Sequence, residues 1–174
     1  MNIVLCGMMG CGKTTVGLAL AKKTEWRWYD TDGLIVDRYG KISDIFEYYG
    51  EPYFRSLETQ IAKELSAQDG LILSTGGGMV LKAENAALLK DHGKIVFLRA
   101  SKETLAQRLT LDGTRPLLQS KEEKVLDRLQ RLLMERTPVY ESVSDLTVDV
   151  DGKTPEAIAE EILRALEVKC EGQV

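Results

Sequence analysis

The chain has 174 residues, of which 44% are hydrophobic and 29% charged, as is typical of a single globular domain. Its net charge of −4 excludes a general attraction to nucleic acid, so an anionic substrate would need a local group of arginines. No apolar run approaches a membrane span of roughly 20 residues. The start of the chain runs straight into a strand rather than a signal peptide, and the scattered cysteines fit a reducing cytoplasm.

Apolar runs and helical patterns alternate along the chain. Short runs rich in Ile, Val and Leu predict buried parallel strands at 2–6, 27–30, 70–74, 94–98 and 145–150. Helical patterns lie at 13–23, 33–39, 43–49, 52–68, 82–91, 101–111, 121–137 and 154–168. This alternation predicts a parallel α/β sheet covered on both faces, which binds ligands beyond the carboxyl ends of its strands.

The first strand leads into a glycine-rich loop. Residues 7–14, GMMGCGKT, match the phosphate-binding pattern G-x-x-x-x-G-K-[ST] in full. Glycines let backbone N–H groups converge on a phosphate, and the helix that opens here adds its positive dipole end. Lys13 can then reach the β/γ-phosphates, and the Thr14 hydroxyl can bind Mg²⁺. A glycine turn that merely joins strand to helix is the alternative, but the complete match favours a nucleoside triphosphate site.

The second strand ends in a pair of carboxylates, Asp30 and Asp32. If the strand persists, both point the same way, so one could face Mg²⁺ through water and the other could accept a proton from a substrate hydroxyl. Either could instead be the N-cap of the next helix. Residues 30–33 also spell the D-x-x-G switch of GTPases, but no N-K-x-D guanine motif occurs in the chain.

Two further segments suit the recognition of a substrate. Arg55 and Glu58 share a face of a predicted helix, either as a surface ion pair or with Glu58 orienting Arg55 to grip a carboxylate. The glycines at 76–78 follow the third strand. They could form a plain tight turn, but three in a row favour a segment that leaves space for a ligand to lie against backbone N–H groups.

Two more arginines lie in the second half of the chain. Arg115 belongs to a loop with hinge-like Gly and Pro residues, which could close over a nucleotide or be an ordinary exposed connection. Arg136 lies near the end of a helix that Pro138 is expected to stop, where a cation could simply compensate the helix dipole.

Taken in order, these pieces resemble the shikimate kinases over roughly residues 2–166. The matching segments are 7–15, 30–32, 54–58, 76–78, 114–118 and 135–140. The first is shared by many phosphate-loop proteins, whereas the combination is far more specific. The resemblance implies one kinase domain over 1–174, a P-loop NTPase with a three-layer α/β/α fold and a five-stranded parallel sheet. It also implies a substrate-binding helical segment near 33–61 and a mobile lid near 112–124.

The resemblance further implies a reaction. A monomer would transfer the γ-phosphoryl group of ATP to the 3-hydroxyl of shikimate, with Mg²⁺ as cofactor, on the route to chorismate and the aromatic amino acids. Asp32 would bind the shikimate hydroxyls and act as base, and Lys13 and Arg115 would be the other catalytic groups. Arg55 and Arg136 would hold the shikimate carboxylate beside the Gly77 backbone.

The resemblance also implies a nucleotide site. Its residues would be Gly10, Cys11, Gly12, Lys13, Thr14, Thr15, Arg108, Arg115 and Lys153. Thr14 would bind Mg²⁺ directly and Asp30 through water. Near the adenine the family often has an arginine where this chain has Lys153, which keeps the charge but loses planar stacking.

Two other functions stay open from the sequence. A gluconate kinase of the same fold would also bind a carboxylate, so charge alone does not separate it. A nucleotide-binding regulatory module predicts a degraded acceptor site, and the presence of Asp32, Arg55, Gly77 and Arg136 argues against it.

Overall fold

Five parallel strands form the centre of the computed structural model, which describes residues 1–111 and 122–168. The strands are β1 (Asn2–Cys6), β2 (Arg27–Asp30), β3 (Leu71–Ser74), β4 (Gly93–Arg99) and β5 (Leu146–Asp149). They pair in the order β2-β3-β1-β4-β5, all in parallel. The predicted strands and the predicted parallel sheet are therefore confirmed.

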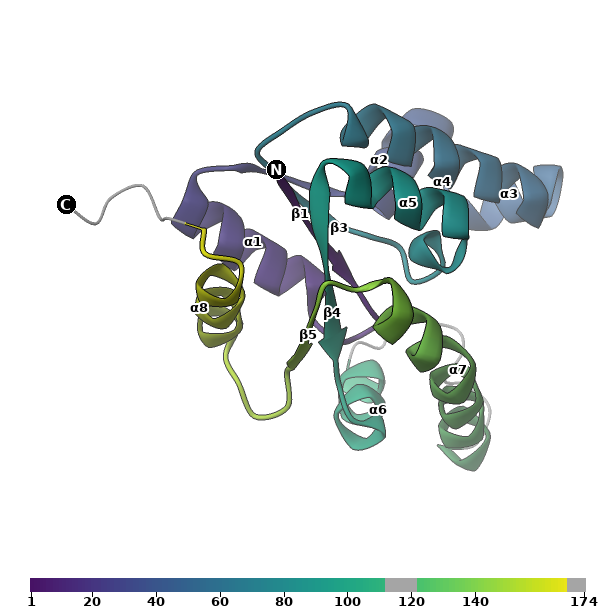
Figure 1. The fold of residues 1–174 in the computed structure, drawn as a ribbon. Coiled ribbons are helices and arrows are strands. Elements are labelled where there is room, and N and C mark those ends of the chain that lie inside the picture. The colour runs from purple at the N-terminus through teal and green to yellow at the C-terminus, as the bar shows by residue number, and fades with distance from the viewer. Residues whose placement is uncertain (112–121, 169–174) are drawn as a thin grey trace.

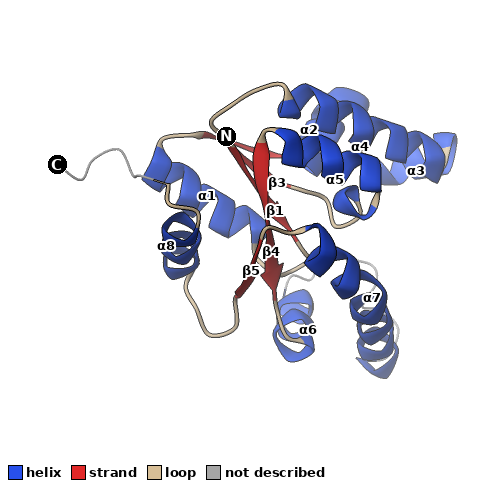
Figure 2. Cartoon of the chain, viewed as in Figure 1, coloured by secondary structure: helices blue, strands red, loops and turns tan. Residues whose placement is uncertain are grey.

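Helices cover the sheet on both sides. They are α1 (Lys13–Thr24), α2 (Thr31–Tyr39), α3 (Ile42–Tyr49), α4 (Glu51–Ser66), α5 (Ala83–Asp91), α6 (Lys102–Leu111), α7 (Glu122–Val143) and α8 (Pro155–Ala165), with a 3₁₀ turn η1 at Met79–Leu81. In Figure 1, α1 and α8 pack together on one side, and α5 and α7 lie on the other. Figure 2 shows the red strands between these blue helical layers, which confirms the three-layer fold. Among the described residues, no helix combines the length and apolar composition needed to cross a membrane.

The core follows from the position of β1 in the middle of the sheet. Ile3, Val4 and Leu5 are fully buried, because helices cover both faces of a parallel sheet. The neighbouring strand β4 adds Ile95 and Val96, which are also fully buried. This rigid layer places the loops after β1, β2 and β3 at one edge, where the candidate site lies.

The prediction that Pro138 stops its helix is wrong, because α7 runs through this residue to Val143. Proline removes one helical hydrogen bond and strains the turn before it. Contacts beyond the proline outweigh that cost: Tyr140 is fully buried, and its ring packs on Phe97 with centroids 5.1 Å apart. The Tyr140 hydroxyl also donates to the Gly77 carbonyl at 2.6 Å.

Candidate active site

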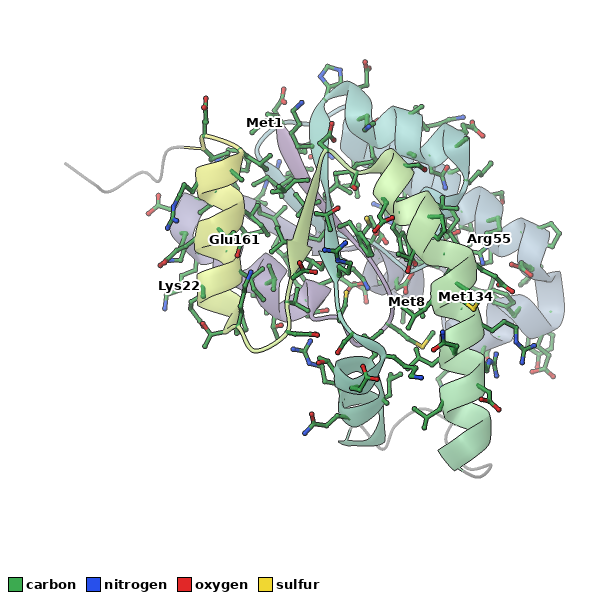
Figure 3. The ribbon with its side chains drawn as sticks, turned by 60° about the horizontal axis from the view of Figure 1, so that its bottom comes forward. Met1, Met8, Lys22, Arg55, Met134 and Glu161 are labelled. Carbon is green, nitrogen blue, oxygen red and sulfur yellow. The ribbon has the colours of Figure 1, made fainter. Side chains whose placement is uncertain are left out.

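A pocket of about 600 Å³ opens at the carboxyl edge of the sheet. Figure 3 brings this edge forward, with Met8 of the phosphate loop and Arg55 of α4 labelled. Every predicted site residue that the structure describes lines this pocket: Gly10, Cys11, Gly12, Lys13, Thr14, Thr15, Asp30, Asp32, Arg55, Gly77, Arg108, Arg136 and Lys153. Arg115 and residues 112–121 of the predicted lid lie outside the described residues.

The phosphate loop wraps around the start of α1. Gly7 and Gly12 have φ values of 139° and 100°, which side chains rarely adopt, and a Cβ atom on Gly7 would lie 2.7 Å from the Leu98 carbonyl oxygen. The Lys13 ammonium donates to the carbonyl oxygens of Gly7 and Met8, at 2.9 Å each. Lys13 therefore spans the loop and carries a positive charge in the lining of the pocket.

Asp30, at the end of β2, and Asp32, just after it, lie in different local structures. The strand ends at Asp30, whose Oδ1 accepts the Gly33 N–H at 3.0 Å and caps α2. The helix thus begins at Thr31, earlier than predicted, and Asp32 lies in its first turn rather than on an extended strand. Asp30 Oδ2 is also 3.5 Å from the Thr14 hydroxyl. Asp30 is therefore both a helix cap and part of the pocket wall.

Arg55 is held from two sides. Its Nη1 donates to Glu58 at 2.8 Å, and its Nε and Nη2 donate to Glu51 at 3.2 and 2.9 Å. Glu58 is 1% exposed, and burial, opposed by the attraction of Arg55, raises the pKa of its carboxyl. The pair is therefore a buried support for the guanidinium rather than a surface ion pair. Sequence reasoning missed Glu51, although its spacing of four residues from Arg55 is typical of helical ion pairs.

Arg136 reaches the same pocket from α7. A Cβ atom on Gly77 would lie 3.3 Å from Arg136 Nη1 and 3.7 Å from the Tyr140 hydroxyl, so these groups meet over the glycine. Burial raises the pKa of Tyr140 to about 12, which keeps its hydroxyl protonated as a donor to Gly77. Tyr140 ends the matching segment 135–140, but sequence reasoning gave it no role, because only the fold brings it against the glycine loop.

The opposite end of the pocket lies beside α6 and α8. Arg108 Nη1 donates to the Gly10 carbonyl at 3.1 Å. Lys153 pairs with Glu161 at 2.6 Å, and the apolar side chains of Pro155 and Ile158 line the wall next to it. Arg108 therefore contacts the phosphate loop, and Lys153 lines the same pocket.

A hydrogen-bond relay joins β2, β3 and the phosphate-loop helix. Trp28 Nε1 donates to the Ser74 hydroxyl at 3.0 Å, which in turn donates to the Lys13 carbonyl at 2.9 Å. Gly17 makes room for the indole, because a Cβ atom there would lie 2.4 Å from Trp28 Nε1. The relay fixes the first turn of α1 against the sheet.

We expect Trp28→Phe to lower the free energy of unfolding by about 1–2 kcal/mol, since it removes one part-buried hydrogen bond together with the nitrogen-bearing ring of the indole and keeps a six-membered aromatic ring. Urea denaturation measures this loss. Trp26→Phe is the matched control, because Trp26 bonds Thr24 Oγ1 through its backbone N–H, which phenylalanine keeps. Equal losses in the two variants would remove the relay as the cause.

A phosphate loop at the start of α1, in a pocket that also holds Asp32, Arg55 and Arg136, defines a P-loop kinase that acts on a small acidic molecule. The sequence model of one family, described as shikimate kinase, matches residues 9–167. The chain belongs to the shikimate kinase family.

Individual relatives are similar over nearly the whole chain. The shikimate kinase of Caldicellulosiruptor bescii is 42% identical over 163 residues, which cover 93% of each chain. That of Neisseria gonorrhoeae is 45% identical over 149 residues, covering 85% of this chain and 86% of the relative. Among solved structures, the shikimate kinase of Acinetobacter baumannii in complex with shikimate superimposes with a TM-score of 0.87 at 38% identity, covering 95% of this chain and 92% of that one.

Proposed function

We propose that this protein transfers the γ-phosphoryl group of ATP to the 3-hydroxyl of shikimate, giving shikimate 3-phosphate and ADP on the route to chorismate. The observation that carries this proposal is a single pocket in which Asp32, Arg55 and Arg136 lie beside the phosphate loop. Family membership gives it independent support. The gluconate kinase and regulatory-module alternatives have no comparable observation in their favour.

The nucleotide half of the pocket suits ATP. Phosphoryl transfer passes through a loose transition state, so the protein contributes mainly positioning and positive charge. Lys13 and the loop N–H groups would hold the β- and γ-phosphates. Arg108 and Lys153 would flank the rest of the nucleotide, and Arg115 of the proposed lid near 112–124 would add a further positive charge.

The residues at this edge also fit Mg²⁺. The Thr14 hydroxyl and Asp30 Oδ2, 3.5 Å apart, are hard oxygen donors. Within residues 1–111 and 122–168, no group of three or more His, Cys, Asp or Glu side chains could hold a metal ion. Thr14 would bind the ion directly and Asp30 through water. When bound, Mg²⁺ neutralises charge on the phosphates.

The acceptor half suits a hydroxylated carboxylic acid. A guanidinium has five N–H groups, and Glu51 and Glu58 use three of those of Arg55, so two remain for a carboxylate. Arg136 would contact the same carboxylate from α7, with the Gly77 backbone beside it. Asp32 would then bind the reacting hydroxyl and accept its proton late, because a loose transition state needs little early proton transfer.

The remaining expectations belong to the same proposal. We expect a monomer, because the pocket needs no residue of a second chain to bring Asp32, Arg55 and Arg136 beside the phosphate loop. Cys6 and Cys11 are free thiols, which supports a reducing cytoplasm as the place of action. The net charge of −4 supports small anions bound locally, rather than nucleic acid, as partners.

A coupled ADP-release assay tests the proposed function. The protein is incubated with ATP and Mg²⁺ and with shikimate, gluconate, quinate or no acceptor. We expect fast turnover with shikimate alone. If gluconate is turned over in preference, the assignment of the ATP site stands, but the roles of Arg55 and Arg136 must be revised. If ATP binds and no acceptor is turned over, a regulatory module is favoured.

Replacing Arg136 with alanine should raise the shikimate KM by about tenfold or more and change kcat less, because its proposed partner is a non-reacting carboxylate. Steady-state kinetics at varied shikimate measure the split. Arg131→Ala on the same helix, at an exposed position, is the control and should behave like the wild type. An unchanged shikimate KM in Arg136→Ala would contradict the carboxylate assignment.

A further inference from the structure

The glycines at 76–78 are not required by the backbone. None of the three has a positive φ, and Gly78 has φ −94° and ψ −15°, a helical conformation open to any residue. A tight turn therefore does not explain them. The segment must therefore require glycine because glycine has no side chain.

The space beside these glycines is filled by charged side chains of the protein. A Cβ atom on Gly76 would lie 2.3 Å from Asp32 Oδ1 and 3.0 Å from its Cγ. A Cβ atom on Gly78 would lie 2.3 Å from Arg55 Nη1 and 2.9 Å from its Cζ. Non-bonded heavy atoms prefer separations of about 3.5–4.0 Å, so neither side chain could stay in place beside a methyl group. At Gly77 the closest atom, Arg136 Nη1, is 3.3 Å away, which is tight but not prohibitive.

The backbone of this segment is anchored. The Gly76 N–H donates to the Thr31 hydroxyl at 3.0 Å, and Thr31 is fully buried. The Gly77 carbonyl accepts from Tyr140, and the Gly76 and Gly78 carbonyls accept from the N–H groups of the following 3₁₀ turn. An added methyl group would therefore displace the carboxylate or the guanidinium, which end flexible side chains, rather than the loop.

We propose that Gly76 and Gly78 are positioning residues that act through Asp32 and Arg55, respectively. Gly76 sets the place of the carboxylate at the reacting hydroxyl, and Gly78 sets the place of the guanidinium that grips the substrate carboxylate. This inference rests on the proposed function and deepens it. It separates two roles within three consecutive glycines: Gly76 governs turnover, and Gly78 governs acceptor affinity.

The test compares Gly76→Ala and Gly78→Ala in the full-length protein by steady-state kinetics. We expect Gly76→Ala to lower kcat by about tenfold or more with the KM for ATP unchanged, as for a misplaced reacting group. We expect Gly78→Ala to raise the shikimate KM by about tenfold with a smaller change in kcat. Wild-type kinetics in both variants, or equal effects on kcat and KM in both, would overturn the proposal.

Double variants show whether each glycine acts through its proposed partner. In an Asp32→Ala background the carboxylate is gone, so Gly76→Ala should lower kcat by less than about twofold further. An undiminished loss in that background would overturn the proposal.

A second double variant, Gly78→Ala with Arg55→Ala, separates the positioning role of Gly78 from a general loss of stability. Arg55 Nη1 bonds the buried Glu58, so Gly78→Ala could destabilise the chain. In an Arg55→Ala background the methyl group meets no guanidinium, so Gly78→Ala should leave the melting temperature unchanged. A further drop there would show that alanine disturbs the loop itself and would overturn the role of Gly78.

The outcomes of the two proposals are separable. The wild type alone decides the substrate, because it either turns over shikimate or another acid. The variants are then compared on whichever acid the wild type uses. Failure of the positioning roles would show only in the variants, with the wild-type activity intact.

Discussion

Replacing Lys13 with methionine should lower kcat by about 1,000-fold, the largest effect expected of any single change here. Methionine keeps an unbranched apolar stem like that of lysine and lacks the ammonium group. That group already lies on the loop, where it donates to the Gly7 and Met8 carbonyl oxygens at 2.9 Å. Charge that moves onto the transferring phosphoryl group would then have no fixed cation beside it. Coupled ADP release with saturating shikimate measures the loss.

Lys22→Met is the matched control for this variant. Lys22 lies in the last turn of the same helix, α1, with its side chain exposed, and it is labelled far from Met8 of the phosphate loop in Figure 3. It loses the same charge from the same helix, so we expect wild-type kinetics. Similar losses in both variants would mean that net charge, and not the phosphate loop, controls the rate.

Replacing Asp32 with asparagine should lower kcat by about 100-fold, in the range of a lost general base. The amide keeps the size of the side chain in the first turn of α2 but can neither accept a proton nor bind the hydroxyl as an anion. Nucleotide binding should change little, because Lys13 and Thr14 stay as they are. Steady-state kinetics for both substrates, with ATP binding by calorimetry, measure these effects.

The control is Asp37→Asn on the exposed side of the same helix. It removes the same negative charge from α2 and should leave kcat unchanged. Full activity of Asp32→Asn would remove this carboxylate from the reaction. A raised shikimate KM with normal kcat would leave Asp32 a binding role only.

Much of the fold could be predicted because its signals are local. Each strand is a short apolar run, since a strand covered on both faces must be apolar throughout, as Ile3, Val4 and Leu5 illustrate. The residues at which helices begin and end could be predicted less well, because they depend on capping side chains and on tertiary contacts. Asp30 caps α2 and starts it early, and contacts of Tyr140 carry α7 past Pro138.

The same contrast holds for the site. The spacing of Arg55 and Glu58 predicts that they meet, but not that Glu58 is buried and Arg55 held from a second side by Glu51. The glycines at 76–78 predict open space. Their neighbours in the fold, Asp32 and Arg55, come from segments more than 20 residues earlier, so no local pattern could reveal what fills that space.

The sequence by itself determined the parallel sheet, the phosphate loop and the identity of the charged groups, because periodicity and close-range motifs express backbone geometry directly. Only the tertiary structure decided which of these groups share one pocket and which neighbours hold them in place. Those outcomes depend on packing between segments distant in the chain, in which burial of Tyr140 outweighs a helix-breaking proline and a missing Cβ atom at Gly76 admits a carboxylate.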